Sequence, residues 1–206
     1  MKVYNLRGDL SSYHSSYSRF CFSSTLIILL IPLLLLLVVL IALVLKIQTD
    51  GPLFYSQKRV GLHHREFVIY KFRTMYVNAE SNEPMWTQQD DSRITPFGKV
   101  LRKFHLDELP QLINILKGEM QLIGPRPERK VFCELIAEEI PDYDIRHSVL
   151  PGITGWAQVH QVYSASVDEA KLKHQYDLDY LSRASLGMDL KIICLTFRDI
   201  ILAKGH

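Results

Sequence analysis

A single apolar run near the start of the chain constrains its fold more than any other feature. It reads LIILLIPLLLLLVVLIALVL, from Leu26 to Leu45, and it contains no charged residue. A helix of about 20 apolar residues is long enough to cross the hydrocarbon core of a bilayer. The run is too long for the core of a signal peptide, and no small-residue cleavage site follows it. The sequence therefore predicts a membrane anchor.

Two arrangements of this segment fit the residues. A straight spanning helix is the usual outcome for this length, whereas Pro32 removes a backbone donor inside the run and favours a kink or break. A break at membrane depth requires partners for the freed backbone groups. Basic residues flank both ends of the run: Lys2, Arg7, Arg19, Lys46, Lys58 and Arg59. The positive-inside rule expects an excess on one side, so these flanks suit a re-entrant hairpin on the cytoplasmic face. Both arrangements stay open at this point.

Composition excludes several classes of function. The 206 residues include 24 Lys and Arg against 22 Asp and Glu, and this balance gives no global signal for a nucleic-acid partner. Three cysteines, Cys21, Cys133 and Cys194, are odd in number and far apart, so they predict neither a disulfide framework nor a zinc site. The eight histidines form no ligand cluster along the sequence, and His63 and His64 are interpreted as part of a polar turn.

Hydrophobic periodicity predicts one domain of class α/β or α+β, with a small sheet surrounded by helices. Strand-like stretches lie within residues 49–57 and 65–75, on either side of the turn GLHHR, and residues 77–96 are expected to form a loop. Helices are expected at 97–106, 108–117, 127–143 and 166–184. Ser166 and Glu169 match a capping box at the start of the fourth of these helices. Gly118 stands where a glycine commonly ends a helix.

The last helix carries an apolar face that has two interpretations. Its members are Leu190, Ile193, Cys194, Phe197, Ile200 and Ile201, at helical spacing. Such a face is most often part of a protein core. Beside a membrane segment, it can instead lie on the bilayer surface.

Adjacent carboxylates in the stretch HLDELPQL are the strongest candidates for chemistry. Asp107 is expected to cap the helix at 108–117, with Pro110 in its first turn, where a missing N–H is harmless. Capping is the more common role for an isolated Asp at such a position, and Glu108 can be an ordinary first-turn acid. A carboxylate can also attack phosphorus, and a neighbouring one can hold Mg²⁺ together with phosphate oxygens.

Basic residues near the carboxylate pair favour a role in phosphate and metal chemistry over helix capping. Arg102 precedes the pair, and Arg126 follows it in the stretch GPRPER, between Pro125 and Pro127, which stiffen the backbone. An arginine on such a rigid loop suits bidentate recognition of phosphate. Further cations lie near the membrane segment in KRVG, with Lys58 and Arg59, and in KFRTM, with Arg73. These can also be solvated strand ends or contacts to lipid headgroups. Together these residues indicate a site for phosphate and metal.

Five ordered motifs resemble the bacterial sugar transferase family, the monotopic phosphoglycosyltransferases. They are KRVG, KFRTM, DDSRITPFGKVLRKFHLDELPQL, GPRPE and PGITGWAQV. The resemblance implies transfer of a sugar 1-phosphate from a UDP-sugar to undecaprenyl phosphate, with release of UMP and a need for Mg²⁺. It implies that Asp107 is the nucleophile, through a covalent aspartyl-phosphosugar intermediate, and that Glu108 is its metal-associated partner. Arg102 and Arg126 match family arginines near the phosphates.

The resemblance also implies an organisation and a location. Residues 1–18 are expected to form a flexible tail, 19–47 a re-entrant membrane helix broken at Pro32, and 48–206 a catalytic domain on the cytoplasmic face of the bacterial inner membrane. The implied role is the first membrane step of exopolysaccharide or glycoconjugate synthesis. A phosphohydrolase and a silent membrane scaffold are the alternative functions, and the sequence leaves a homo-oligomer open.

The chain departs from the family pattern at four places. Ile31 replaces the usual Ser before Pro32, and Phe22 occupies a position that is often Asp. HQV follows GWAQV where small members have Asn-Gly-Arg, so one substrate arginine is missing. The stretch YSASVDEAKLKHQYDLDYL resembles the catalytic domain of longer members, which carry extra N-terminal spans. The chain is therefore expected to be a compact member or a catalytic core.

Overall fold

The computed structural model of the chain describes residues 16–48, 50–77, 79, 91–160 and 167–203. The elements, in order, are α2 (Ser16–Gln48), β1 (Phe54–Val60), η2 (Leu62–His64), β2 (Glu66–Phe72), α3 (Pro96–Lys103), η3 (Leu106–Gln111), α4 (Leu112–Leu116), β3 (Gln121–Ile123), α5 (Lys130–Glu139), η4 (Tyr143–Ser148), β4 (Gly152–Thr154), α6 (Trp156–Val159), α7 (Val167–Arg183) and α8 (Leu186–Ile201). Most of the expected tail at 1–18, part of the expected loop at 77–96 and the expected cap Ser166 lie outside the described residues.

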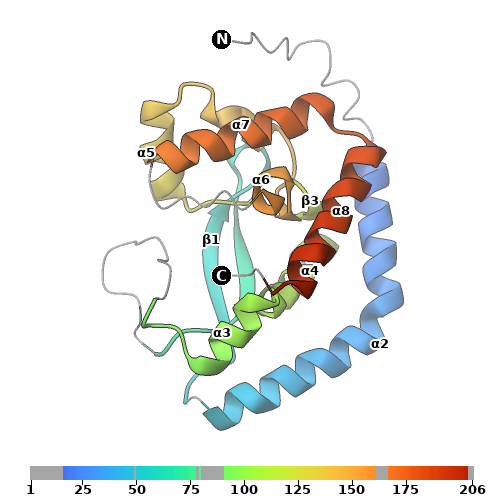
Figure 1. Cartoon of the computed structure of the whole chain (residues 1–206), viewed down its shortest axis with the longest axis vertical. Helices are drawn as coiled ribbons and strands as arrows, with labels where there is room; N and C mark the ends of the chain where they lie inside the picture. The colour runs from blue at the N-terminus through green and yellow to red at the C-terminus, as the bar shows by residue number, and fades with distance from the viewer. Residues whose placement is uncertain (1–15, 49, 78, 80–90, 161–166, 204–206) are drawn as a thin grey trace.

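An antiparallel hairpin of β1 and β2 occupies the centre of the fold (Figure 1). Phe67 and Ile69 are buried on one face of β2, and Phe72 is buried on the other, as the period of two in a strand requires. Lys71 follows Phe67 and Ile69 on the same face. The hairpin therefore directs one lysine toward the protein interior.

A second, parallel pair joins segments far apart in sequence. Gln121 in β3 pairs with Gly152 in β4, and Ile123 pairs with Thr154. A Cβ at Gly152 would lie 2.1 Å from the amide nitrogen of Gly124, so only glycine allows the two chains to approach this closely. The predicted mixture of helices with a small sheet is confirmed, but the described strands form two small sheets instead of one.

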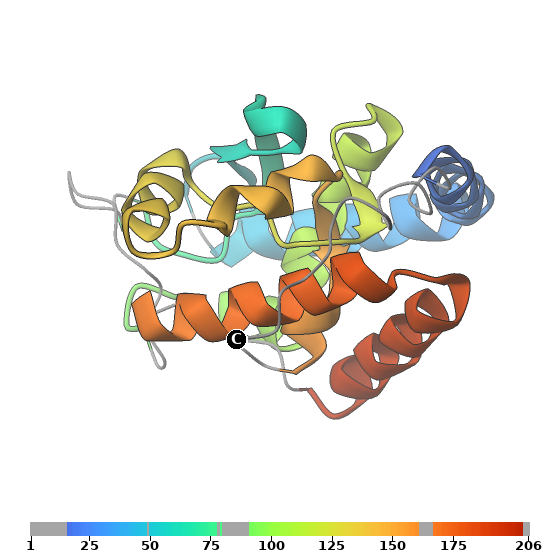
Figure 2. The same cartoon turned by 90° about the horizontal axis from the view of Figure 1, so that it is seen from above.

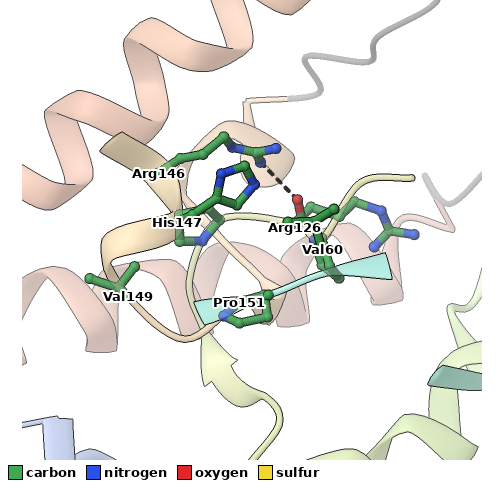
Figure 3. A pocket seen from close by; sticks show the side chains of 9 residues that line it. Val60, Arg126, Arg146, His147, Val149 and Pro151 are labelled. Carbon is green, nitrogen blue, oxygen red and sulfur yellow. Dashed lines mark hydrogen bonds between the residues drawn. The ribbon is translucent and has the colours of Figure 1, made fainter. Parts of the chain in front are cut away.

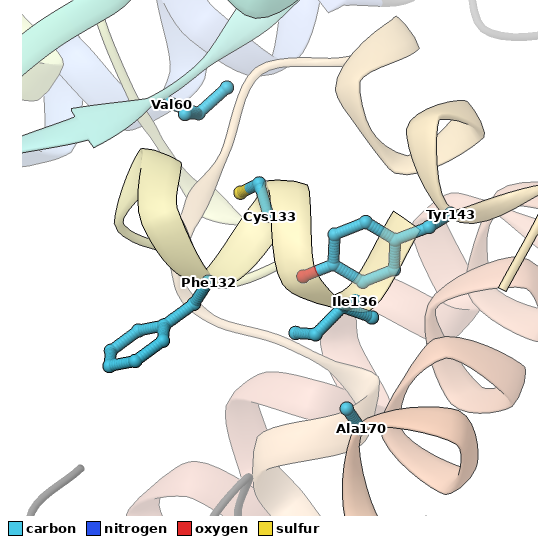
Figure 4. Packing of buried hydrophobic residues seen from close by; sticks show 6 residues of the cluster. All are labelled: Val60, Phe132, Cys133, Ile136, Tyr143 and Ala170. Atoms are coloured by element: carbon cyan, nitrogen blue, oxygen red, sulfur yellow. The ribbon is translucent and has the colours of Figure 1, made fainter. Parts of the chain in front are cut away.

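Helices α5, α7 and α8 complete the hydrophobic core. In the view from above, α7 lies on the opposite side of the molecule from the β1–β2 turn, with α5 and η4 between them (Figure 2). Val60, Cys133, Ile136 and Tyr143 belong to one buried cluster, which joins β1, α5 and η4 and also reaches Ala170 of α7 (Figure 4). This packing fixes the segment between β3 and α5 against the hairpin.

Helix α2 is continuous through Pro32, but its axis bends, so that its two halves run in different directions (Figure 1). Proline lacks the N–H of the helical ladder and clashes with the preceding turn, which accounts for a bend. The end of the helix packs through Ile41 and Leu45 against Phe72 and Leu101. The expected break is therefore a bend within one helix.

The middle of α2 exposes large apolar side chains, including those of Leu29, Leu33, Leu35, Leu36 and Leu43. Within the described part of the chain, Ile31–Gln48 is the one helical window long and apolar enough to cross a membrane. Its mean hydropathy is 2.7, and 11% of it is buried in the protein. Its length and composition agree with the predicted membrane segment.

The predicted apolar face of α8 does not lie in the core. Leu190, Phe197 and Ile201 are 52%, 61% and 79% exposed, and Ile192 is the residue of the helix that is fully buried. The interpretation of this face as core is therefore wrong. The other interpretation, that this face lies on the bilayer surface, stays a prediction.

Candidate active site

The carboxylate pair lies in a 3₁₀ turn between α3 and α4. The residue before the turn, His105, has a left-handed backbone (φ 55°), and no side chain caps the turn. Asp107 is therefore inside the turn, and its predicted role as a helix cap is wrong. Gly118 ends α4 with φ 75°, as predicted. Both carboxylates are almost fully buried, at 6% exposure for Asp107 and 5% for Glu108.

Glu108 is held by two cations. Lys71 Nζ donates to Oε1 at 2.7 Å. Arg126 uses two nitrogens: NH1 donates to Oε2 at 3.3 Å, and NH2 donates to Oε1. Burial pushes the pKa of Glu108 upward, but attraction to Arg126 and Lys71 outweighs it and sets the pKa well below its usual range. Glu108 is therefore a permanent anion that fixes the positions of both cations.

Asp107 differs sharply from its neighbour, because no described residue gives its carboxylate a hydrogen bond or ion pair. Burial raises the pKa of Asp107, as does the charge of Glu108, although three nearby cations oppose the rise. A carboxylate with few donors is more basic, and hence a better nucleophile and cation ligand, than one that is already paired. The pair thus contains one carboxylate fixed by two cations and one without a hydrogen-bond or ion-pair partner among the described residues.

Arg102 brings a third cation to the pair. Its Nε donates to Thr74 Oγ1 at 2.8 Å, and its two terminal nitrogens have no hydrogen-bond partner among the described residues. Burial lowers the pKa of Arg102, and the charge of Asp107 counteracts this. The guanidinium is therefore oriented by Thr74, from the motif KFRTM, and keeps free donors for an anion.

The Gly124–Arg129 loop is anchored through its backbone. Arg146 NH2 donates to the carbonyl oxygen of Arg126 at 2.7 Å (Figure 3), and Gly152 N donates to the carbonyl oxygen of Pro125 at 3.0 Å. Arg146 is itself fixed by Asp177 of α7, with NH2 and Oδ2 2.9 Å apart. Beside these residues is a small cavity of about 10 Å³, which His147 and Pro151 also line. The loop thus presents the Arg126 side chain on a rigid support.

Glu128, in the same loop, forms a second buried ion cluster. It pairs with Lys173 of α7 and lies 3.5 Å from Arg59 NH1. Burial opposes ionisation of Glu128, but Lys173 and Arg59 lower its pKa to about 2. Val60 N also donates to the carbonyl oxygen of Glu128 at 2.9 Å, so the loop is tied to β1 as well as to α7.

The structure brings some predicted site residues together and places others elsewhere. Asp107, Glu108, Arg102 and Arg126 meet, and Pro125 and Pro127 flank Arg126 as expected. Arg59 supports the loop by contacts with Glu128 and the carbonyl of Pro127.

Two predicted cations point away from the carboxylates. Lys58 is 77% exposed and lies near Glu66 on the hairpin surface. Arg73 donates to the carbonyl oxygen of Asp50, near the end of α2.

Lys71 is the main site residue that the sequence analysis missed. It belongs to KFRTM, the motif from which Arg73 was selected. The sequence contained evidence for this residue, because Lys71 follows Phe67 and Ile69 at intervals of two residues. In a strand this spacing places all three on the same, largely apolar face. A charged residue on the buried face of a strand requires a partner.

Comparisons with known proteins point to one family. A sequence model of the bacterial sugar transferase family matches residues 14–203. The chain is 44% identical over 178 residues to the UDP-N-acetylgalactosamine-undecaprenyl-phosphate N-acetylgalactosaminephosphotransferase of Aeromonas hydrophila, covering 86% of this chain and 42% of that protein.

Two further relatives carry glucose in their names. The undecaprenyl-phosphate glucose phosphotransferase of Komagataeibacter xylinus is 38% identical over 205 residues, which cover 97% of this chain and 38% of that protein. The UDP-glucose:undecaprenyl-phosphate glucose-1-phosphate transferase of Escherichia coli is 38% identical over 175 residues, which cover 84% of this chain and 37% of that protein. The chain spans about two fifths of the length of these relatives.

Proposed function

Because the chain belongs to the bacterial sugar transferase family, we propose that it transfers a sugar 1-phosphate from a UDP-sugar to undecaprenyl phosphate and releases UMP. The observation that carries this proposal is the unpaired carboxylate of Asp107 beside three oriented cations, Lys71, Arg102 and Arg126. Three positive charges around two carboxylates leave a net positive site, which favours a diphosphate substrate. The reaction is the first membrane step in assembly of an exopolysaccharide or glycoconjugate.

The transfer proceeds in two displacements at the same phosphorus atom. First, an oxygen of Asp107 bonds to the β-phosphorus of the UDP-sugar, and the bridging oxygen leaves with UMP. Second, a phosphate oxygen of undecaprenyl phosphate bonds to that phosphorus, and the carboxylate of Asp107 leaves. The free terminal nitrogens of Arg102 and the partly exposed guanidinium of Arg126 hold phosphate oxygens during both steps.

Mg²⁺ fits the same residues. Asp107 offers a carboxylate with no donor among the described residues, and Glu108 keeps lone pairs beyond those that Lys71 and Arg126 occupy. Mg²⁺ commonly uses one or two carboxylates together with phosphate oxygens. When bound, the ion offsets negative charge on the diphosphate and on the departing UMP. Asp107 and Glu108 are therefore the proposed metal ligands.

The membrane arrangement is part of the proposal. The exposed leucines of α2 and the exposed apolar face of α8 contact lipid, and the bend at Pro32 supports a re-entrant helix that returns to the cytoplasmic face of the inner membrane. In this arrangement residues 1–18 form a tail, 19–47 lie in the membrane, and 48–206 form the catalytic domain. The site then opens near the membrane surface, where the lipid phosphate of the acceptor lies.

Release of UMP from purified protein tests this function. UDP-N-acetylgalactosamine and UDP-glucose are supplied with Mg²⁺, with and without undecaprenyl phosphate. Continuous UMP release that needs the lipid supports transfer, whereas steady release without it supports hydrolysis. A covalent intermediate predicts about one UMP per enzyme without lipid, and a matching gain of mass on the intact protein.

Asp107→Asn provides the critical variant. We expect it to abolish transfer and the mass gain, because an amide cannot form the new bond to phosphorus. Since Asp107 caps no helix and has no hydrogen bond or ion pair with a described residue, the melting temperature should change little. The control is Asp168→Asn, at a position of α7 that is 93% exposed, which should retain full activity. Substantial turnover by Asp107→Asn would exclude Asp107 as the nucleophile.

A further inference from the structure

A second group of metal-ligating side chains lies outside the proposed active site. His64 of η2, Asp144 of η4 and His147 of η4 place their ligand atoms within 4.8 Å of one another. His64 and His147 are far apart in sequence, so their separate positions gave no sign of a cluster. Packing of the β1–β2 turn against η4 brings them together. The prediction that the histidines form no ligand cluster is therefore wrong in three dimensions.

The distances suit a tetrahedral ion. Asp144 Oδ1 lies 3.6 Å from Nδ1 of His147 and 3.9 Å from Nδ1 of His64. Zinc bonds of about 2.1 Å place tetrahedral ligand atoms about 3.4 Å apart. The two gaps to Asp144 are too long for hydrogen bonds, and they need to contract by about half an ångström or less to hold an ion. The imidazole nitrogens of the two histidines lie within 4.8 Å of each other and need to approach by up to about 1.4 Å. Both movable partners are exposed, at 56% for His64 and 60% for Asp144.

His147 supplies an independent observation. Its side chain is only 5% exposed, and its Nδ1 is buried with no hydrogen-bond partner while facing Asp144. A buried polar atom without a partner is energetically costly, and a metal bond would offset that cost. The opposite ring nitrogen, Nε2, lies 3.9 Å from Cys133 Sγ. A proton on Nε2 that is directed at the sulfur leaves the lone pair of Nδ1 for a metal.

We propose that His64, Asp144 and His147 form a binding site for Zn²⁺ or a similar transition-metal ion, distinct from the Mg²⁺ site at the carboxylate pair. Two imidazoles and one carboxylate select such an ion over Mg²⁺, which prefers oxygen ligands. The fourth position faces solvent. The ion joins the β1–β2 turn to η4, whose Arg146 supports the Arg126 backbone, so its role is to stabilise the site architecture.

Titration of the purified chain with metal ions tests this site. The protein carries an affinity tag that contains no histidine, and no UDP-sugar is present. Chelator-stripped protein should bind one equivalent of Zn²⁺ in calorimetry, in the presence of excess Mg²⁺. Co²⁺ should give the intense visible absorption of a tetrahedral complex. Because both assays are independent of turnover, their outcome is separable from that of the proposed function.

Two matched variants decide the assignment. His63 and His64 both have left-handed backbones, with φ 50° and 60°, which asparagine tolerates. His64→Asn should weaken Zn²⁺ binding at least about tenfold, whereas His63→Asn and Asp107→Asn should leave it unchanged. Asp144→Asn, also at an exposed position, should weaken it similarly. Absence of one-equivalent binding by the wild type, or an equal loss in His63→Asn, would overturn the proposal.

Discussion

Asp177→Asn is the sharpest test of the idea that a buried ion pair positions the Arg126 loop. Arg146 and Asp177 are 2% and 3% exposed, and Arg146 NH2 also holds the carbonyl oxygen of Arg126. The substitution keeps the shape of residue 177 but removes the counter-charge of a buried guanidinium. Breaking a buried pair in this way costs about 3–5 kcal/mol.

The expected loss of stability is about 3 kcal/mol, since the amide oxygen of Asn retains roughly 1 kcal/mol of hydrogen bonding to Arg146. In a protein of this size, 1 kcal/mol corresponds to about 2–4 °C, so the melting temperature should fall by about 6–12 °C. Differential scanning fluorimetry of detergent-solubilised protein measures this shift. Several scan rates are needed, because membrane proteins often unfold irreversibly.

Activity should fall as well, below the melting temperature, because Arg146 no longer fixes the loop. A positioning role predicts a lower kcat together with a higher KM for the UDP-sugar. The control, Asp168→Asn, lies on the same helix in an exposed pair with Lys171, 3.5 Å apart. It should change the free energy of unfolding by less than about 0.5 kcal/mol. A shift below 2 °C in Asp177→Asn, with normal kinetics, would refute the reasoning.

Three further predictions concern the site and the membrane. Arg126→Lys keeps the charge but loses the planar guanidinium that can donate two hydrogen bonds to a phosphate, so kcat/KM should fall about 30-fold, or about 2 kcal/mol. A rate near wild type would show that Arg126 supplies charge alone. Glu108→Gln should lose activity and respond less to Mg²⁺, and an unchanged Mg²⁺ titration would reject its role at the metal. Pro32→Leu should straighten α2 and carry the N-terminal tail across the membrane, so that a cysteine placed at position 12 reacts with an impermeant reagent from outside. Labelling of that cysteine in a chain that keeps Pro32 would exclude the re-entrant arrangement.

Local sequence patterns predicted the elements whose formation depends mainly on residues close together in the sequence. The alternation in EFVIYKF and the turn GLHHR predicted the hairpin, and the length of the apolar run predicted α2. The pairing of β3 with β4 was missed, because each strand has three residues and long-range contact creates it. Likewise, the apolar face of α8 has the spacing of a core helix, and no local signal states whether protein or lipid covers it.

Motifs predicted which residues lie together better than they predicted what each one contacts. Arg102, Glu108 and Arg126 meet as expected, but a motif does not show which cation in KFRTM turns inward. The alternation of side chains along the strand shows which cation turns inward. Lys71 lies on the buried face of β2, whereas Arg73 comes after the end of the strand. Arg146 and Asp177 were missed because they lie 31 residues apart, and only packing of α7 against η4 brings them into contact.

The 3₁₀ conformation explains why two adjacent carboxylates differ in their contacts. With about three residues per turn, successive side chains point roughly 120° apart. Glu108 therefore forms hydrogen bonds with Lys71 and Arg126, while Asp107, which leaves the turn in another direction, has no hydrogen bond or ion pair with a described residue. An Asp at a helix cap would instead have its oxygen occupied by backbone N–H groups, which lowers its basicity. The loss of the cap, which the sequence did not predict, is thus the feature that leaves the carboxylate of Asp107 without a donor among the described residues.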